Sequence, residues 1–374
     1  MSWNSIIGQG RAKEILQRSI EQKRVAHAYL LWGPRGVGKD ALALEFAKTL
    51  LCHTQGTEAC GVCASCTKMR NLQHPNLKIV FALPAGKSEK NSDNSEGKLQ
   101  PDIRDEIRRQ LSEKAKNPYF HFDIPKATQI NIGTIRDVKK ESSLAAYEKG
   151  MKIFIISDAE MMNDTSANSM LKVLEEPLSD TLFILTTSRK EKLLTTIVSR
   201  CQSVGCELLS DGEIEQALAE RENIPPEQAR LISRLAGGDY SAALELVNED
   251  LVSGRAEAVR FLRSALSGRS VTLLEDIEER IAENDRDAVN RFLSLLLVWF
   301  RDAMLMKEQG DEGIINQDQH EDLSKFVVRF GNANFPASID AVERALELLR
   351  GNVYLPLVLL SLSVQLKRIL LNAK

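Results

Sequence analysis

The chain contains a glycine-rich stretch made of the residue types that bind phosphate. Gly33, Gly36 and Gly38 lie within the segment GPRGVGKD, and Lys39 follows the last glycine. Glycines let backbone N–H groups approach phosphate oxygens, and a lysine at this position reaches the outer phosphates of a nucleotide. The next residue is usually Ser or Thr, whose hydroxyl binds Mg²⁺, but here it is Asp40. A carboxylate at this position would repel the negatively charged phosphates unless a metal ion lay between the two groups.

A carboxylate at the end of a second apolar run is the expected partner of this loop. The run KIFIISDAE places Asp158 where a buried parallel strand delivers an acid to Mg²⁺ beside the phosphates. An ATPase normally has Glu next, to orient the attacking water, but Ala159 follows here, and Glu160 on a strand would face the other way. Thr187 ends a third apolar run and is a further candidate for contacting a phosphate. A strand with an incidental Asp remains the alternative interpretation of Asp158 taken alone.

Four of the six cysteines fall in one short segment and have metal-ligand spacing. They are Cys52, Cys60, Cys63 and Cys66. Four thiolates in a tight loop fit a tetrahedral Zn²⁺ and leave no position for water, so we expect a structural zinc. A redox-active C-x-x-C pair is the alternative, although it does not need a third and a fourth cysteine.

The elements around these residues predict how they are positioned. A buried strand over 28–32 precedes the glycine loop and a helix over 41–48 follows it, which is the strand–turn–helix order of a phosphate site. The segment 77–81 alternates like a strand, and the apolar run at 181–187 also reads as a strand. From residue 208 onward only helical periodicity remains, so we predict an α/β domain followed by all-helical regions.

An unusually polar insertion interrupts the α/β region at 84–118. Its first half, 86–97, is rich in Lys, Glu, Ser, Asn and Gly and is predicted to be mobile. Its second half, 101–116, is predicted to form an exposed, charged helix. We expect the insertion to be solvated, and its sequence suggests no chemical role.

Composition describes an ordinary globular protein of two or three domains. The chain has 374 residues, 43% hydrophobic and 27% charged, with a formal net charge of −3. That charge provides no global electrostatic basis for binding nucleic acid. The first residues lack a signal-peptide pattern and the apolar runs are too short to span a bilayer, so we expect a cytoplasmic protein.

These motifs, taken in order, resemble one family. The glycine loop, the four-cysteine insertion, Asp158, the segment LKVLEEP at 171–177 and the Ser199-Arg200-Cys201 triplet occur together in the clamp-loader AAA+ subunits of bacterial DNA polymerase III. The resemblance implies a P-loop AAA+ domain over 1–207, with a parallel sheet, flanking helices and a zinc insertion at 52–66. It further implies a small helical lid over 208–250 and an all-α collar domain over 251–374.

Within that family the chain resembles the delta-prime type more than the gamma/tau motor type. The motor has Ser or Thr after the loop lysine, Asp-Glu at the strand end and a sensor arginine in the lid. This chain has Asp40, Ala159 and Ser241 at those positions. The resemblance also implies that Arg200 points out of its own subunit and into a neighbour's ATP site, where it stabilises the transferred phosphoryl group. Without the family, a surface salt bridge would be the favoured interpretation of Arg200.

The resemblance therefore implies a non-hydrolysing, stator-like subunit that is not an ATPase on its own. Its implied partners are the gamma/tau and delta subunits, with the sliding clamp and primer-template DNA as part of the complex. Its own site is expected to bind ATP and Mg²⁺ weakly or not at all. Two alternatives remain: an active gamma/tau-type ATPase in which Asp40 binds Mg²⁺ and Glu160 reaches the water, and a zinc-dependent nucleic-acid-binding module.

Overall fold

The computed structural model describes residues 2–54, 56–84, 101–176, 180–267, 270–281, 285–311, 313–351 and 353–371. The chain divides into two compact units, Met1–Ala217 with Gly238–Ala242, and Leu218–Gly237 with Ala243–Lys374. We call them the N-terminal and C-terminal units and treat each separately. The predicted mobile segment 86–97 lies outside the described residues, as does Pro177, the last residue of the LKVLEEP segment.

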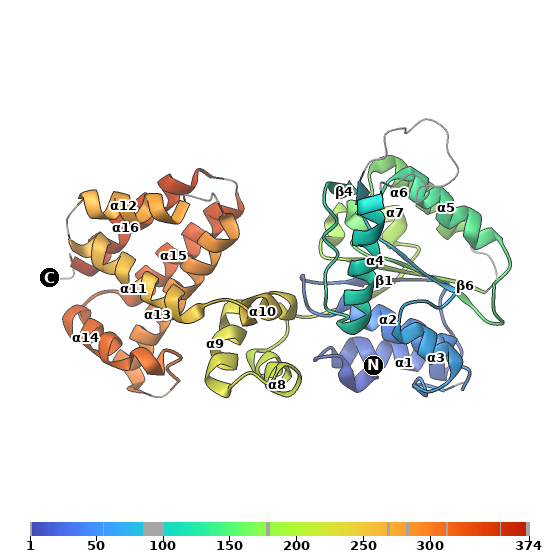
Figure 1. Ribbon diagram of the computed structural model, residues 1–374, viewed down its shortest axis with the longest axis horizontal. Coiled ribbons are helices and arrows are strands. Elements are labelled where there is room, and N and C mark those ends of the chain that lie inside the picture. Colours follow the sequence, from blue (N-terminus) through green and yellow to red (C-terminus); the bar gives the residue numbers. More distant parts are fainter. Residues whose placement is uncertain are drawn as a thin grey trace. The chain divides into compact units, whose positions relative to one another are not determined.

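A parallel five-stranded sheet of order β2-β5-β6-β1-β7 forms the centre of the N-terminal unit (Figure 1). In its register Leu30 of β1 lies beside Leu185 of β6, and Ile155 of β5 beside Ile184. The predicted parallel sheet is therefore confirmed. The strands are β1 Ala28–Trp32, β2 Leu77–Val80, β5 Lys152–Ile156, β6 Thr181–Thr187 and β7 Gln202–Gly205.

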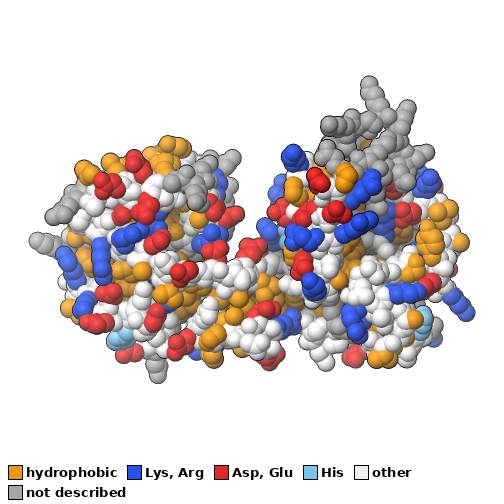
Figure 2. Space-filling view, in the orientation of Figure 1, with side chains coloured by type: hydrophobic (Ala, Val, Ile, Leu, Met, Phe, Trp, Pro, Cys, Tyr) orange, Lys and Arg blue, Asp and Glu red, His pale blue; other side chains and the backbone are white. Residues whose placement is uncertain are grey.

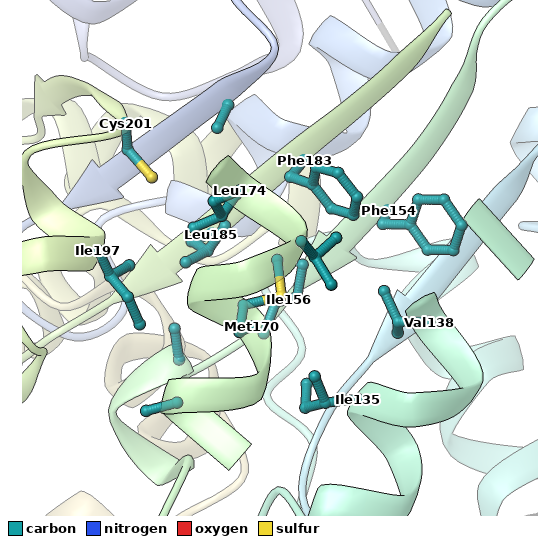
Figure 3. Close-up of a cluster of buried hydrophobic side chains, with 14 of the residues drawn as sticks. Ile135, Val138, Phe154, Ile156, Met170, Leu174, Phe183, Leu185, Ile197 and Cys201 are labelled. Carbon is teal, nitrogen blue, oxygen red and sulfur yellow. The ribbon is translucent and has the colours of Figure 1, made fainter. Parts of the chain in front are cut away.

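Helices cover both faces of this sheet, which explains why its central strands are apolar without alternation. On one face Phe154 and Phe183 stack at a centroid distance of 5.3 Å, in a cluster that α5 and α6 cover with Val138 and Met170 (Figure 3). On the opposite face Tyr29 of β1 meets Phe46 of α2 edge-on at 5.1 Å. Burial on both sides holds the carboxyl ends of β1, β5 and β6 in fixed positions.

The N-terminal unit also contains an antiparallel pair, β3 and β4, and the helices around the sheet. The pair consists of β3 Leu83–Pro84 and β4 Ala127–Gln129. The α-helices are α1 Gly10–Glu21, α2 Lys39–Leu51, α3 Ala64–Arg70, α4 Pro101–Lys116, α5 Ile132–Ser143, α6 Asp164–Glu175 and α7 Thr195–Val198. Single 3₁₀ turns are η1 Trp3–Ser5, η3 Ala159–Met161 and η4 Lys190–Lys192.

Helix α4 has the predicted bounds, but it is not the simply exposed helix that its composition indicates. Ile103 and Ile107 pack on a small cluster containing Phe81 and Leu83. On the same face of α4, seven residues after Ile107, Lys114 is only 3% exposed. The helix is therefore part of the fold, and the expectation of a solvated insertion is wrong for residues 101–116.

Beyond Gly205 every named element of the described chain is helical, as predicted. The elements are α8 Asp211–Glu222, α9 Pro226–Ala236, α10 Tyr240–Val247, α11 Leu251–Ser267, α12 Ser270–Ile281, α13 Arg286–Gln309, η5 Gln317–Gln319, α14 His320–Phe330, α15 Phe335–Arg350 and α16 Leu355–Leu371. Within the C-terminal unit Phe261 of α11 packs edge-on against Phe292 of α13 at 5.2 Å. The division into a lid over 208–250 and a collar over 251–374 stays a prediction.

Charged side chains of both signs are interspersed on the face of the N-terminal unit seen in Figure 2, as the near-neutral composition implies. Among the described residues, no helix combines the length and the apolar character that a membrane crossing requires.

Candidate functional site

The glycine loop has the backbone shape of a phosphate loop, but another part of the chain packs against it. Gly36 and Gly38 have φ values of 66° and 97°, in the left-handed region that favours glycine, and Lys39 then begins α2. A Cβ on Gly36 would lie 1.5 Å from Oδ1 of Asp239. The N–H of Tyr240 also donates to the Gly36 carbonyl at 3.2 Å. A carboxylate therefore packs directly on the loop.

Lys39 is turned back onto its own loop. Its Nζ donates to the carbonyls of Gly33 at 2.9 Å and Pro34 at 2.5 Å, and to Oγ of Ser188 at 3.0 Å. Burial lowers the pKa of Lys39, partly opposed by the nearby Asp40 and Asp158 carboxylates. The three contacts use the three donors of the ammonium, so a phosphate would have to replace contacts that the chain already supplies.

Asp40 is bound by a cation from the insertion helix. Its Oδ2 accepts from Nζ of Lys114 at 2.6 Å, and its carboxylate also accepts from Thr186 at 2.8 Å and Ser157 at 3.3 Å. Burial by itself raises the pKa of Asp40, but the Lys114 ammonium more than offsets this effect, so the pKa lies below its usual value. An ion pair thus stands where a loop hydroxyl would hold Mg²⁺ in an active site.

Asp158 and Glu160 lie near Lys39, but not in the conformation predicted for them. Strand β5 ends at Ile156, Asp158 has a left-handed φ of 50°, and Glu160 lies in the 3₁₀ turn η3. The prediction that Glu160 continues a strand and faces away is therefore wrong. Its Oε1 accepts the Ser188 N–H at 3.0 Å, and it contributes to the field acting on Lys39.

The pKa of Asp158 is raised to about 7, mainly by burial and next by the nearby Asp40 and Glu160 carboxylates. A carboxyl group whose pKa is raised by folding stabilises the folded protein fully at a pH below its pKa in the unfolded chain, about 4. This stabilisation is lost as the pH rises through its pKa in the folded protein, about 7. We expect Asp158→Asn to stabilise the protein by about 2 kcal/mol more at pH 8 than at pH 4, allowing for the carboxylate's partial exposure. Urea unfolding at both pH values measures this difference.

A matched exposed change on α15, Asp340→Asn, is expected to shift the unfolding free energy by less than about 0.5 kcal/mol at either pH. An Asp158→Asn effect that is equal at pH 4 and pH 8 would contradict the raised pKa.

The hydroxyl that reaches this site from β6 belongs to Thr186. Thr186 donates to Asp40 and accepts the Asp158 N–H at 3.3 Å, which ties the loop helix to the end of β5. The predicted contact residue, Thr187, is fully buried, and its hydroxyl accepts the Arg189 N–H at 3.1 Å. Alternation along a strand distinguishes such neighbours, but the sequence does not show which of them faces the loop.

Tyr119 is a site residue that the sequence analysis missed. Its ring lies against the loop, since a Cβ on Gly38 would be 2.9 Å from Cε1 of Tyr119. Its hydroxyl accepts the Ile7 N–H at 2.7 Å, and its carbonyl accepts from Oγ of Ser241 at 2.8 Å. The cavity left above the loop has a volume of about 40 Å³, whereas pockets for cofactor-sized ligands usually enclose roughly 300–1,000 Å³.

The four predicted cysteines converge at the end of α2 and the start of α3. Their Sγ atoms all lie within 4.8 Å of one another, with Cys52–Cys63 and Cys60–Cys66 each at 4.0 Å. A disulfide needs about 2.05 Å, whereas sulfurs bound to one tetrahedral zinc lie about 3.8 Å apart. The arrangement therefore fits a shared metal ion and not a disulfide.

Local hydrogen bonding also suits thiolates at this cluster. The N–H of Cys60 points at Sγ of Cys52 at 3.3 Å, and the N–H of Cys66 at Sγ of Cys63 at 3.4 Å. Backbone N–H groups of Val62 and Cys63 lower the pKa of Cys60 to about 6, whereas burial raises that of Cys66 to about 12. A bound divalent cation would supply the charge that keeps all four deprotonated.

Arg200 lies on a turn between two buried anchors. Ile197 and Cys201, on either side of it, reach the hydrophobic cluster under the sheet (Figure 3), which leaves Arg200 half-exposed between them. Its guanidinium pairs with Oε1 of Glu175, at the end of α6, at 2.7 Å and donates to the Thr196 carbonyl at 3.0 Å. In the isolated chain Arg200 is therefore at the surface, but it is held by an intramolecular ion pair.

Comparison with known proteins agrees with the motif pattern. The family described as "DNA polymerase III, delta subunit" matches residues 8–209, more than half of the chain. DNA polymerase III subunit delta' of Bacillus subtilis is 28% identical over 348 residues, covering 92% of each chain. The delta' subunit of Pseudomonas aeruginosa is 30% identical over 245 residues, covering 64% of this chain and 62% of the relative.

A solved structure of a DNA polymerase III gamma subunit-related protein from Thermotoga maritima aligns over 96% of this chain and 99% of its own. Its TM-score is 0.41 and its identity 17%. The predicted clamp-loader, delta-prime-like character is confirmed by the sequence matches, and the chain belongs to the DNA polymerase III delta subunit family.

Proposed function

We propose that this chain is the non-hydrolysing, stator-like delta-prime subunit of a DNA polymerase III clamp loader. In this role it assembles with ATPase subunits of the gamma/tau type and with a delta subunit, and it supplies Arg200 to a neighbour's ATP site. The sliding clamp and primer-template DNA are then partners of the whole complex. The observation that carries the proposal is the buried ion pair between Asp40 and Lys114 inside the chain's own phosphate loop.

This ion pair opposes nucleotide binding in two ways. An incoming Mg²⁺ would have to displace the Lys114 ammonium from Asp40, and removing one partner of a buried pair costs about 3–5 kcal/mol. The β- and γ-phosphates would also meet Lys39 already bound to three oxygens, in a space narrowed by Tyr119. Both features are built from the chain's own residues, which supports the proposal that the loop binds nucleotide weakly or not at all.

The proposal for Arg200 follows from its position at the surface. The ion pair with Glu175 is partly exposed, with side chains 35% and 42% accessible, and such pairs contribute only about 0–1 kcal/mol. A neighbour's nucleotide, with several negative charges, can therefore compete for the guanidinium. In this role Arg200 would stabilise charge on the transferred phosphoryl group, while this chain contributes no nucleotide of its own.

For the cysteine cluster we propose one structural zinc bound by Cys52, Cys60, Cys63 and Cys66. Cys52 follows the last turn of α2 and Cys63 caps α3, so the metal would fix the α2–α3 connection. With four protein ligands the ion has no open coordination position and supplies no catalytic chemistry.

We assign the contacts between subunits to the collar region, and helix α16 supports this. Leu355, Val358 and Leu362 are buried on one side, whereas a second apolar stripe is exposed. The exposed apolar residues of α16 are Leu357, Leu360, Val364 and Leu371. Their spacing of three, four and seven residues places them on one face, as expected for a helix that packs on a partner.

An active gamma/tau-type ATPase is the competing function, and turnover by the purified chain distinguishes it. We expect ATP hydrolysis at the background level, unchanged by Lys39→Ala, because the loop is filled by Lys114 and Tyr119. Isothermal titration with Mg·ATP is expected to show no saturable binding up to about 1 mM. Rapid turnover that Lys39→Ala abolishes would establish the ATPase instead.

A further inference from the structure

A large groove on the N-terminal unit is lined by cations and has no role in the proposed function. It lies between α2 and α3 on one side and α4 on the other, and its volume is about 870 Å³. Four basic side chains line it: Lys48, Arg70, Arg108 and Lys116. No Asp or Glu is among its described lining residues.

Apolar side chains form the floor between these cations. Leu44 and Met69 are buried at the base, and Leu72 and Leu111 are partly exposed on either side. Leu72 has a φ of 54°, a left-handed conformation that costs about 1–2 kcal/mol for a residue with a Cβ. The groove is therefore mixed in character, with an apolar base under a basic rim.

Three of the four basic residues are held only weakly, whereas the fourth, Lys48, is buried and pairs with Glu45 at 3.4 Å. Arg108 and Lys116 pair with carboxylates one turn earlier on α4, Asp105 at 3.4 Å and Glu113 at 2.9 Å. Such exposed pairs, three residues apart on a helix, are worth about 0.5 kcal/mol or less. Arg70 donates to the Gly61 carbonyl at 3.0 Å, a contact that does not neutralise its charge.

We propose that this groove binds an acidic peptide segment that carries apolar side chains, contributed by a partner protein. Carboxylates of the segment would pair with Arg70 and Arg108, whose guanidinium forks fit them bidentately. Its apolar side chains would cover Leu44, Leu72 and Leu111, which a phosphate backbone alone cannot do. None of the described residues that line the groove is aromatic, so they do not provide the stacking that single-stranded nucleic acid uses.

The chain offers an unusually close control for this proposal. Arg108 and Arg109 are neighbours on α4, and each pairs with a carboxylate three residues earlier, Asp105 and Glu106. Only Arg108 lines the groove. Charge reversal at each position changes the net charge by the same amount. Arg109→Glu also removes a bidentate pair with Glu106 at 2.6 and 2.8 Å, whereas Arg108→Glu removes a single contact with Asp105 at 3.4 Å. The control therefore disturbs the pairing on α4 at least as much, but only Arg108→Glu takes a cation out of the groove lining.

Binding of a short fluorescein-labelled peptide with the repeat Glu-Glu-Leu to the full chain, followed by fluorescence anisotropy, tests the proposal. Arg108→Glu and Arg70→Glu are each expected to weaken binding about tenfold, and Arg109→Glu less than about twofold. A Glu-Glu-Ser repeat is expected to bind at least about fivefold more weakly, because it leaves the apolar floor uncovered. Leu72→Ser should reduce that preference for the leucine peptide.

Three results would overturn the proposal. The first is no binding of the leucine peptide, or equal binding by the Arg108→Glu and Arg109→Glu variants. The second is tighter binding of oligothymidylate than of the peptide, with a steep salt dependence that Arg108→Glu removes, which would assign the groove to nucleic acid. The third is self-association that Arg108→Glu abolishes, detected by analytical ultracentrifugation, which would assign it to a second copy of the chain.

Discussion

Replacing Arg200 with alanine is expected to lower ATP hydrolysis at the neighbouring subunit's site by about 100-fold in the reconstituted clamp loader. A guanidinium that contacts the phosphoryl group in the transition state has no substitute among water molecules, which explains the size of the effect. Total turnover of the complex should fall by the share that this site contributes. Steady-state hydrolysis in the presence of the clamp and primed DNA measures the loss.

Two further variants separate this role from a structural one. Arg200→Lys keeps the charge but loses the planar fork, so it should restore only a small part of the turnover. Glu175→Gln removes the intramolecular partner of Arg200 and should leave turnover undiminished. Arg200→Ala should also leave the chain folded, with a Tm within about 2 °C of the parent, because the ion pair is at the surface. Unchanged turnover in the Arg200→Ala complex would remove the proposed role.

The second large effect concerns the cysteine cluster. We expect metal analysis to find about one zinc per chain and Cys63→Ser to lose it, because three thiolates with a weak hydroxyl ligand hold zinc poorly. Cys63 also caps α3, so the change should destabilise the N-terminal unit by several kcal/mol and lower its Tm by about 10 °C. Zinc content and thermal unfolding of the same preparation measure both effects.

Cys206 provides the control, since it is buried but lies outside the cluster. Cys206→Ala should retain the metal. It should lower the free energy of unfolding only by the packing contribution of one sulfur atom. A chelator should reproduce the Cys63→Ser destabilisation in the parent chain and have little further effect on the variant. A parent chain that contains no zinc would end the metal proposal.

The sequence predicted the parts of the fold that are set by local patterns. Strands β1 and β6 have the predicted bounds because their runs are apolar without interruption and end at glycine or polar residues. The cysteine cluster was also predictable, because spacing within one short loop determines which sulfurs can meet. In both cases the residues that act together lie close in the chain.

The contacts that occupy the phosphate loop could not be predicted, because the residues that make them are distant in sequence and belong to no recognisable motif. Lys114 is one of several cations in a charge-rich helix, and 74 residues separate it from Asp40. Tyr119 and Asp239 reach the loop only after the chain has folded around the sheet. Glu160 was misplaced because the strand pattern was extended past Ile156, where β5 ends, whereas Asp158 has a left-handed backbone that no strand contains.

The central claim is that this chain acts on another subunit's nucleotide and not on its own. It is tested most directly by comparing Lys39→Ala and Arg200→Ala in the reconstituted complex, with ATP hydrolysis as the measured quantity. We predict that Lys39→Ala leaves hydrolysis unchanged, whereas Arg200→Ala lowers it by the share that the neighbouring site contributes. The reverse pattern, with hydrolysis lost on Lys39→Ala and retained on Arg200→Ala, would contradict the account.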